Sequence, residues 1–386
     1  MKRILTAESV CIGHPDKLCD RISDHILDAA LRLDPDSRVA VEALATGNKI
    51  VVAGEISCSG RLNAREIVRD ALEEAGYDPD MFTISVFLHA QSRDIAEGVK
   101  RSLETRTYGK GSMEIGAGDQ GTMYGYATDE CGEMLPLPLV LSHRICLLLD
   151  DARMEGRIKG ILSDGKAQVS VEYEDDVPKR VSAVVISVQH MEHKTLGELE
   201  DDISREVIPA AFADFPLDEG TKVYINPSGR FVKGGPDADT GLTGRKIMVD
   251  TYGGLAPHGG GAFSGKDATK VDRSGAYMAR FIARNIVAAG LAKRCTVALS
   301  YAIGKADPVA VDVCTYGTGV CSDERISKVV PDVFNLRPGD IIAELGLSRP
   351  IYSNTSAYGH FTDSDFPWEK DDKDSQRRLK EKLGDV

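Results

Sequence analysis

The sequence predicts an α+β protein in which helices cover one face of mostly antiparallel sheets. Two observations lead to this prediction. Stretches rich in β-branched residues come in pairs joined by short turns, as in hairpins, and stretches with apolar residues at helical spacing follow them. This unit occurs three times, with breaks near residues 102 and 232. We therefore expect domains at 1–102, 116–232 and 233–386, with a flexible lid loop at 103–115.

The first segment is predicted to run strand, helix, hairpin, helix, strand. Pro15 suits the first turn of a helix, and apolar residues continue at helical spacing as far as Leu33. Gly47 and Asn48 suit a two-residue turn, which would pair residue 42 with 53 and residue 40 with 55. The expected elements are a strand at 4–10, a helix at 15–33, strands at 39–44 and 49–56, a helix at 64–75 and a strand at 82–88.

Residues 91–121 differ in composition from the rest of the chain. Six glycines lie between residues 98 and 121, charges are many and apolar pairs are few, which predicts a mobile lid over bound substrate. Beyond it we expect a helix at 136–149, strands at 167–173 and 181–189, a helix at 196–212, a strand at 223–226, a helix at 274–293, strands at 296–303 and 310–315, and helices at 327–334 and 338–345.

Composition excludes several classes of protein. The chain has 386 residues, and its 47 Lys and Arg against 60 Asp and Glu give a net charge of −13, which argues against nucleic acid and anionic membranes as main partners. No run of about 18 apolar residues predicts a membrane span, and no signal peptide opens the chain. The eight cysteines form no C-x-x-C pair, so we expect reduced thiols in a cytoplasmic protein. We interpret His190 and His193 as part of a surface turn rather than a metal site.

Two glycine motifs resemble nucleotide-binding loops, and both fail on context. Residues 116–121 read GAGDQG, but a dinucleotide fingerprint needs a strand before it and an apolar helix after it, and neither is predicted. Residues 260–267 read GGAFSGKD, a P-loop except that Asp267 replaces the Ser or Thr that holds Mg²⁺, and no strand is predicted before it. Its glycine-rich backbone beside Lys266 still suits a phosphate. A plain flexible loop is the alternative.

Charged residues surround this second loop. Lys266 and Lys270 lie four residues apart, with Asp267 and Asp272 interleaved, and two adjacent cations lie upstream at 245 and 246. Because neighbouring cations repel, their grouping predicts an anion between them. A polyphosphate with Mg²⁺ satisfies both signs of charge, the cations taking oxygens and the aspartates taking the metal. The alternative is a solvated surface with salt bridges.

Two smaller features also suit ligands. The run from His14 to Lys17 puts a donor, a carboxylate and a cation at a helix start, which favours anions, although helix capping alone also explains it. Glu42 and Glu55 share one face of the predicted hairpin among apolar residues. They need a cation or a ligand amine unless that face is open to solvent.

Together these segments resemble the S-adenosylmethionine synthetase (methionine adenosyltransferase) family. The matching motifs are GHPDK at 13–17, GAGDQG at 116–121, NPSGRFVKGGPDADTGLTGRK at 226–246, GGGAFSGKD at 259–267, KVDRS at 270–274, NIVAAGL at 285–291, and AYGHF and FPWEK within 357–370. The resemblance covers nearly the whole chain. It implies three similar α+β domains in a pseudo-threefold arrangement, and a homodimer with active sites between the subunits, often paired into tetramers.

The resemblance also implies a reaction and a set of site residues. The sulfur of L-methionine attacks the ribose 5′ carbon of ATP, and the expelled triphosphate is cut to pyrophosphate and phosphate. By position, the catalytic ligands of the triphosphate are His14, Lys166, Arg245, Lys246 and Lys266. Further ATP-binding residues are Asp119, Asp164, Arg230, Phe231, Asp239 and Ala262. The methionine-side residues are Glu55, Gln91, Asp239 and Lys270. The metal ligands are Asp16 and Asp272 for two Mg²⁺ and Glu42 for K⁺.

The chain departs from the family pattern at a few positions. Arg93 replaces a usual Pro, Ile12 a common acidic residue and Ser163 a usual Pro, and residues 100–115 are longer and more basic than the usual lid loop. These departures concern lid behaviour rather than the ligand set. A nucleotide-dependent kinase and a non-enzymatic nucleotide-binding module are the rival classes, and product analysis separates them, because adenosyl transfer leaves no ADP.

Overall fold

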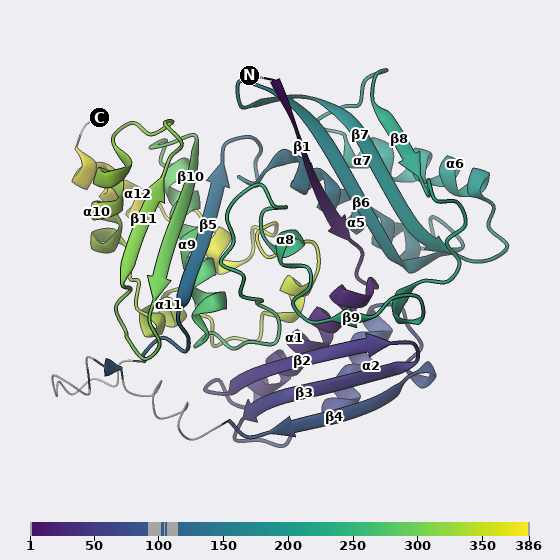
Figure 1. Cartoon of the computed structure of the whole chain (residues 1–386), viewed down its shortest axis with the longest axis horizontal. Coiled ribbons are helices and arrows are strands. Elements are labelled where there is room, and N and C mark those ends of the chain that lie inside the picture. Colours follow the sequence, from purple (N-terminus) through teal and green to yellow (C-terminus); the bar gives the residue numbers. More distant parts are fainter. Residues whose placement is uncertain (1, 92–101, 104, 106–114, 385–386) are drawn as a thin grey trace.

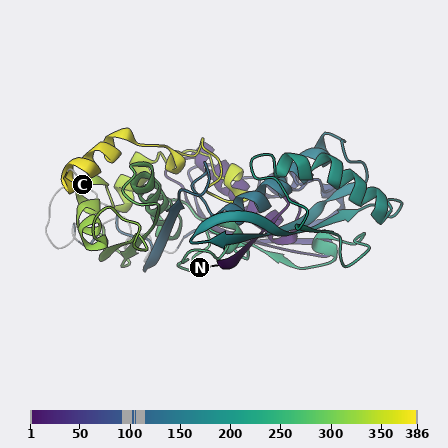
Figure 2. The ribbon, with the colours of Figure 1, turned by 90° about the horizontal axis from the view of Figure 1, so that it is seen from above.

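A layer of sheets and a layer of helices make up the computed structural model, which describes residues 2–91, 102, 103, 105 and 115–384 (Figures 1 and 2). The predicted lid and the Arg93 departure lie largely outside these residues. The strands are β1 (Lys2–Val10), β2 (Arg38–Thr46), β3 (Lys49–Ser57), β4 (Thr83–His89), β5 (Gly121–Thr128), β6 (Ile161–Glu174), β7 (Val177–His190), β8 (Lys222–Ile225), β9 (Gly241–Leu242), β10 (Arg294–Tyr301) and β11 (Ala310–Cys314). The α+β prediction is therefore confirmed.

Three sheets share the strands, in the orders β1-β6-β7-β8, β11-β10-β5 and β4-β3-β2-β9. Most neighbours are antiparallel, and only the β3–β4 and β7–β8 pairs are parallel among the described strands. Each sheet takes one strand from another part of the chain. The first strand, β1, joins β6, while β5 joins β10 and β9 joins β2. This cyclic exchange ties the three sheets into one body.

Helices cover one face of each sheet and leave the other face open on the same side of the molecule (Figure 2). Helices α1 (Pro15–Leu33) and α2 (Ala64–Glu74) cover the β2–β4 sheet, and α5 (Leu137–Met154), α6 (Leu196–Glu206) and α7 (Ile208–Ala211) cover the β1–β8 sheet. The third sheet is covered by α9 (Val271–Ala288), α10 (Asp323–Val333) and α12 (Lys373–Leu383), with α11 (Pro338–Glu344) beside α9. Helix α8 (Ile247–Asp250) is a single turn near β1.

The hairpin prediction is confirmed in register. Thr46 pairs with Lys49 across Gly47 and Asn48, Glu42 pairs with Ala53, and Glu55 pairs with Ala40. Four of the described α-helices and β-strands were missed: β5, which begins at the end of the GAGDQG loop, the two-residue strand β9, the single turn α8, and α12, which is too polar to show an apolar stripe. The helix expected at 196–212 is two helices. Helix α9 begins three residues earlier than predicted and ends at Ala288, close before Gly290, whose φ is +73°.

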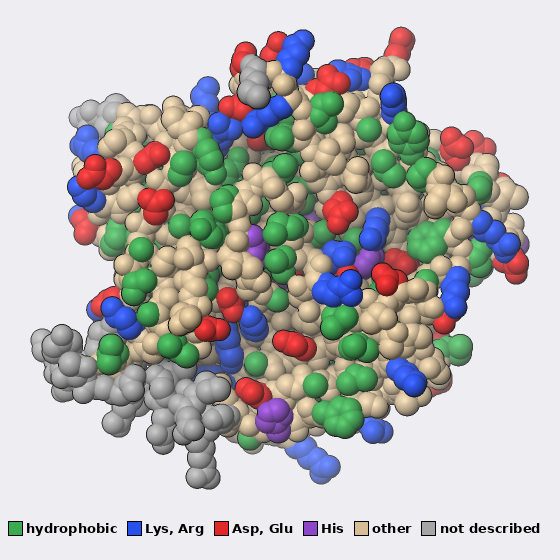
Figure 3. Space-filling view, in the orientation of Figure 1, with side chains coloured by type: hydrophobic (Ala, Val, Ile, Leu, Met, Phe, Trp, Pro, Cys, Tyr) green, Lys and Arg blue, Asp and Glu red, His purple; other side chains and the backbone are tan. Residues whose placement is uncertain are grey.

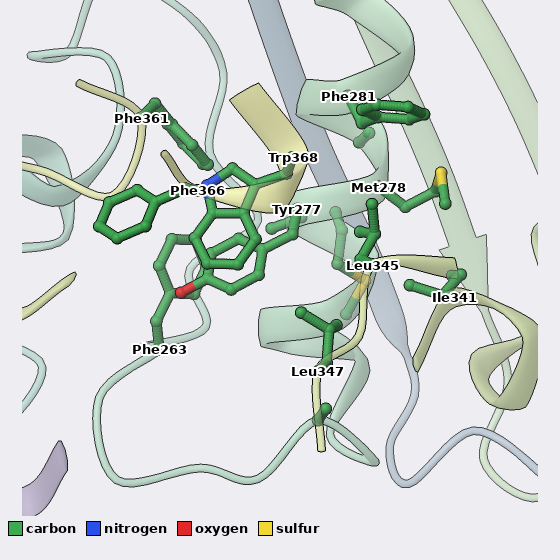
Figure 4. Packing of buried hydrophobic residues seen from close by; sticks show 14 of the residues in the cluster. Phe263, Tyr277, Met278, Phe281, Ile341, Leu345, Leu347, Phe361, Phe366 and Trp368 are labelled. Carbon is green, nitrogen blue, oxygen red and sulfur yellow. The ribbon is translucent and has the colours of Figure 1, made fainter. Parts of the chain in front are cut away.

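The core beneath α9 is aromatic. Tyr277 stacks on Trp368 with ring centroids 3.7 Å apart, and Phe366 also stacks on Trp368, with ring centroids 5.0 Å apart (Figure 4). Phe263, which lies in the GGAFSGKD loop, packs edge-on against Tyr277 at 5.7 Å. This loop is therefore anchored in the core rather than being a plain flexible loop.

All eight cysteines are free, and no described helix is long and apolar enough to cross a membrane.

Candidate active site

The GAGDQG loop is a tight turn leading into a strand, so the exclusion of a Rossmann site is confirmed. Strand β5 begins at Gly121, where a dinucleotide site would need a helix. A Cβ on Gly116 would lie 2.5 Å from the carbonyl oxygen of Gly304, and one on Gly118 would lie 2.7 Å from that of Thr269. These glycines allow close backbone packing beside Lys270. Asp119 is exposed at the tip of the loop.

His14 caps the N-terminus of α1. Its Nδ1 accepts the N–H of Asp16 at 3.2 Å, which leaves the proton of the neutral ring on Nε2. Burial, helped by the nearby ammonium groups of Lys246 and Lys166, lowers the pKa of His14 to about 3. The imidazole is therefore neutral at pH 7, and its Nε2–H is available as a donor.

Asp16 is the centre of the first group of charges. Its Oδ2 accepts a hydrogen bond from Lys246 Nζ at 2.6 Å, its Oδ1 accepts the N–H of Leu242 at 3.0 Å, and Arg245 Nε lies 3.6 Å from Oδ1. Burial alone raises the pKa of Asp16, but the hydrogen bonds from Lys246 and Leu242 bring the pKa below its ordinary value. The carboxylate is charged and paired with cations.

Lys17 does not join this group. Its side chain is 1% exposed, and its Nζ pairs with Asp250 and lies 3.0 Å from Asp20 Oδ2. The GHPDK segment thus supplies a donor and a carboxylate to the site, while its lysine belongs to the interior. The helix capping that the sequence offered as one alternative is confirmed, because the His14 side chain accepts the N–H of Asp16.

The second group of charges lies in the GGAFSGKD loop and the start of α9. Lys266 Nζ donates to Asp272 Oδ2 at 2.7 Å, and Lys270 donates to Asp267. Asp267 also accepts the N–H of Val39 at 2.7 Å and the N–H and hydroxyl of Thr269. Each lysine thus has a carboxylate partner of its own, so no anion is needed to keep the two cations apart.

Strand β2 fixes the two groups relative to each other. Lys266 pairs with Ala40 and Leu242 pairs with Leu44, both on the edge of β2 that β3 leaves free. Four residues of strand separate the two contacts, so these backbone positions are about 13 Å apart. The loops touch again where a Cβ on Gly244 would lie 2.6 Å from the Cβ of Ala262. Figure 3 shows acidic and basic side chains close together near the middle of this face of the molecule.

The remaining predicted ATP-side residues lie along the β6–β7 sheet. Asp164 Oδ2 accepts the N–H of Gly235 at 2.7 Å, and its pKa is raised by burial, with Asp239 close enough to raise it further and Lys166 to lower it. Lys166 and Asp239 are exposed. Arg230 pairs with Glu192 at 2.5 Å. Phe231 donates its N–H to His190 Nε2 at 3.1 Å, and its carbonyl accepts the N–H of His190 at 2.9 Å.

The metal and methionine candidates on the hairpin face are more open. Glu42 is exposed, and no described residue forms a hydrogen bond or ion pair with it. Glu55 lies on the same face, with Oε1 3.7 Å from His89 Nε2. Gln91 follows β4, and its N–H donates to Ser57 Oγ at 3.3 Å. Within the described part of the chain, these three side chains form no hydrogen bond or ion pair with Asp16 or Asp272.

The donor set fits Mg²⁺ that arrives with a phosphate. No group of three or more His, Cys, Asp or Glu side chains gathers within the described part of the chain. Mg²⁺ is usually held by one or two carboxylates together with substrate phosphates and water, so Asp16 and Asp272, each beside a lysine, suit it. Glu42 offers a carboxylate oxygen of the kind that K⁺ accepts.

The sequence reading missed a row of buried aspartates on α1. Asp20, Asp24 and Asp28 continue the four-residue spacing that begins at Asp16, and all are buried. Their four-residue spacing in the sequence places these aspartates on one face of the helix, and this spacing could have predicted a shared role. Of these four aspartates, the motifs predict a site role only for Asp16, which lies in GHPDK.

The fold is of the α+β class, and the loops that carry the paired lysines and aspartates are neither a P-loop nor a Rossmann fingerprint. Models of the N-terminal, central and C-terminal domains of S-adenosylmethionine synthetase match residues 2–100, 114–231 and 233–370. The S-adenosylmethionine synthases of Thermus thermophilus and Clostridium botulinum are 52% and 49% identical, over 96% of this chain and 96% and 97% of their own.

The chain belongs to the S-adenosylmethionine synthetase family. The resemblance stated from the motifs is confirmed, and so is the predicted class of enzyme, a methionine adenosyltransferase.

Proposed function

We propose that this chain forms S-adenosyl-L-methionine by the reaction that the motifs imply. A lone pair of the methionine sulfur forms a bond to the ribose 5′ carbon of ATP, the C5′–O bond breaks, and triphosphate leaves with the electron pair. A water molecule then splits triphosphate into pyrophosphate and phosphate. The thioether has no proton to lose, so the first step needs no general base. The protein must position two substrates and stabilise a polyphosphate.

The observation that carries this proposal is the pairing of cations with carboxylates at the starts of α1 and α9. Lys246 with Asp16 and Lys266 with Asp272 form two units in which each carboxylate neutralises a lysine. A triphosphate offers oxygens to both lysines, together with Arg245, Lys166 and the Nε2–H of His14. We propose these five as the catalytic residues. Asp16 and Asp272 are then free to hold two Mg²⁺, which neutralise charge on the leaving triphosphate.

The residues that bind ATP and those that bind methionine are proposed from the resemblance and from the burial of Asp164. Asp164 and Asp239 lie close together near the exposed Lys166, which supports an ATP site at this end of β6. Residues Asp119, Arg230, Phe231 and Ala262 complete the proposed ATP surroundings. Glu55, Gln91, Asp239 and Lys270 form the proposed methionine side. Glu42 is the proposed K⁺ ligand.

The open sheet face supports a homodimer with active sites between subunits. Ile4 is 61% exposed and Phe87 65% exposed, and both lie on strands of this face. Glu42 and Lys166 are also exposed there. A second copy would bury these apolar residues and bring further groups to the site; pairing of dimers into a tetramer is the alternative assembly. Analytical ultracentrifugation of the wild type and of Phe87→Asp tests this, since the variant is expected to weaken self-association.

The domain boundaries, the cellular compartment and the absence of nucleic-acid or membrane partners are also proposals. We propose domains at 1–102, 116–232 and 233–386, a lid at 103–115, and a pseudo-threefold relation of the domains. The cyclic exchange of β1, β5 and β9 supports such a relation. A net charge of −13 and eight free cysteines support a cytoplasmic protein without nucleic acid or membrane as partner.

Product analysis tests the proposed function. The protein is incubated with ATP, L-methionine, Mg²⁺ and K⁺, and the products are separated by liquid chromatography and mass spectrometry. Adenosylated methionine, pyrophosphate and phosphate are expected in equal amounts. ADP in place of adenosylated methionine would instead identify a kinase, and binding of ATP without products would identify a binding module.

A further inference from the structure

The buried aspartates of α1 each hold a different segment of the chain by its backbone. Asp16, Asp20, Asp24 and Asp28 lie at four-residue intervals on one face of the helix, and each is 0–2% exposed. Their carboxylates accept N–H groups from Leu242, Gly244, Gly265 and the 352–353 pair in that order along the helix. Helix α1 is thus the support on which the charged loops are mounted.

The two middle contacts are alike in geometry. Gly244 donates its N–H to Asp20 Oδ1 at 2.8 Å, and Gly265 donates its N–H to Asp24 Oδ1 at 2.8 Å. Both glycines are in the left-handed region, with φ of +80° and +79°. Each directly precedes a predicted triphosphate ligand, Arg245 or Lys266. A side chain at Gly265 is excluded as well, because its Cβ would lie 1.9 Å from the carbonyl oxygen of Val41.

Buried cations hold the two carboxylates in place. Lys17 Nζ lies 3.0 Å from Asp20 Oδ2 and also pairs with Asp250. Segment 244–250 is thus held to α1 at one end through Asp20 and Gly244 and at the other end through Lys17 and Asp250. Arg273 donates both terminal nitrogens to Asp24, at 2.7 and 2.9 Å. Both oxygens of Asp24 accept hydrogen bonds, while Oδ2 of Asp20 accepts none and is in ion-pair contact with Lys17. These contacts oppose rotation of either carboxylate away from its glycine.

We propose that Asp20 and Asp24 are positioning residues of the triphosphate site, which set the separation of Arg245 and Lys246 from Lys266 by holding Gly244 and Gly265. The two carboxylates are one helical turn apart, a rise of about 6 Å, and rigid because the helix is rigid. The inference rests on the proposed function, in which these cations bind triphosphate. It adds residues that do not touch the substrate but fix those that do.

Asp28 provides a matched control on the same helix. It is buried on the same face and accepts the N–H groups of Tyr352 at 2.9 Å and Ser353 at 2.8 Å. No predicted site cation follows that segment. A variant of Asp28 therefore removes the same kind of anchor without moving a triphosphate ligand.

The test compares Asp20→Ala, Asp20→Asn and Asp28→Ala in the full chain. Melting temperature is measured first, then the Kd of inorganic tripolyphosphate with Mg²⁺ by calorimetry, and kcat and the two Michaelis constants. A shift of a positioned group by about 1 Å costs up to about 100-fold in rate, so Asp20→Ala is expected to weaken tripolyphosphate binding at least about tenfold and to lower kcat. The Michaelis constant for methionine should change less than that for ATP.

The other two variants separate positioning from stability. Asp20→Asn has one oxygen for two donors, so its effect should lie between wild type and Asp20→Ala, and it leaves Lys17 paired with Asp250, which favours folding. Asp28→Ala should lower the melting temperature while tripolyphosphate affinity and kcat stay within about twofold of wild type. If Asp20→Ala does not fold, Asp20→Asn decides the matter.

Two results overturn the inference: wild-type tripolyphosphate affinity in a folded Asp20 variant, or an equal loss of affinity in Asp28→Ala. Failure of the proposed function looks different. In that case the wild-type protein itself neither binds tripolyphosphate nor makes adenosylated methionine, whatever stands at position 20.

Discussion

Asp267 and Asp272 lie on either side of Lys270, and the structure gives them different environments. Asp267 is 2% exposed and accepts four donors: the N–H of Val39, the N–H and hydroxyl of Thr269, and the ammonium of Lys270. Asp272 has a side chain that is 16% exposed and one donor among the described residues, Lys266. In the sequence both are acidic residues beside a lysine in a glycine-rich loop.

The difference shows what separates a structural carboxylate from a ligand-binding one. The oxygens of Asp267 are fully engaged with the protein, and the hydrogen bonds and the Lys270 charge hold its pKa below the ordinary value despite burial. Asp272 retains lone pairs that face solvent, so a metal ion can reach them without breaking the fold. The number of protein donors per carboxylate is therefore the property to test, and the following changes do so.

The largest expected effect follows from removing the cation beside the open carboxylate. Lys266→Ala should lower turnover by ~100-fold or more, because one charged group that stabilises the leaving triphosphate is lost. Turnover is measured by the formation of adenosylated methionine at saturating substrates. Lys194→Ala is the matched control, since Lys194 forms a 2.6 Å ion pair with Asp202 on α6 and should leave turnover unchanged. Equal loss in both variants would contradict the assignment.

The next effect is on stability and directly contrasts the two aspartates. Asp267→Asn breaks a buried ion pair and leaves Lys270 uncompensated, so the free energy of unfolding should fall by about 3 kcal/mol. Asp272→Asn removes a partly exposed pair and should cost less than about 1 kcal/mol, while abolishing Mg²⁺ binding with tripolyphosphate. Urea unfolding and calorimetry measure the two quantities. The comparison fails if Asp272→Asn is the more destabilising of the two.

A carboxylate with no protein donor extends the comparison. Glu42 is exposed on the open face of the hairpin, so Glu42→Gln should leave the melting temperature unchanged. It should remove or strongly reduce activation by K⁺, because the charged oxygen that attracts the ion is lost. Rates are compared in KCl and in a tetraalkylammonium salt of equal ionic strength. A folded Glu42→Gln protein with wild-type K⁺ dependence rules out this role.

The last effect is a pH dependence of stability at a buried carboxylate. Burial raises the pKa of Asp20 from 3.8 to about 7, Lys17 opposes the shift and Asp250 adds to it. The folded protein then binds more protons than the unfolded chain between these values, so this group costs stability as pH rises from about 4 to about 7. Asp20→Asn cannot titrate, and the wild type should lose stability relative to it over that range. Urea unfolding at several pH values measures the difference, and a gain with rising pH would refute the prediction.

The comparison also explains which parts of the site were readable from the sequence. The turn at Gly47 and Asn48 set the hairpin register, because turn geometry is local, and Glu42 and Glu55 were placed on one face correctly. Lys266 and Asp272 were grouped by proximity along the chain. The pairing of Asp16 with Lys246 joins residues 230 positions apart, and without the motif resemblance no pattern in the sequence links them.

The misses have physical causes of the same kind. Strand β5 has few β-branched residues and contains Gly121 and Gly125, so its sequence does not predict a strand. It is a strand because it pairs with β10. Gly125 is needed where β5 packs on α9, because a Cβ there would lie 1.9 Å from the carbonyl carbon of Ala279. The sequence also suggests Lys17 as a cation of the site. The structure shows instead that it is buried and paired with Asp20 and Asp250.

The sequence by itself determined the α+β class, the positions of most helices and strands, and the motifs that identify the family, because periodicity, turn chemistry and spacing are local properties. The tertiary structure alone decided which strands share a sheet, since β1, β5 and β9 pair far from their neighbours in the chain. It also decided which charges are open and which are satisfied. Hydrogen bonding of a carboxylate depends on backbone groups brought to it by folding, as Gly244 is brought to Asp20, and the residue type does not encode that contact.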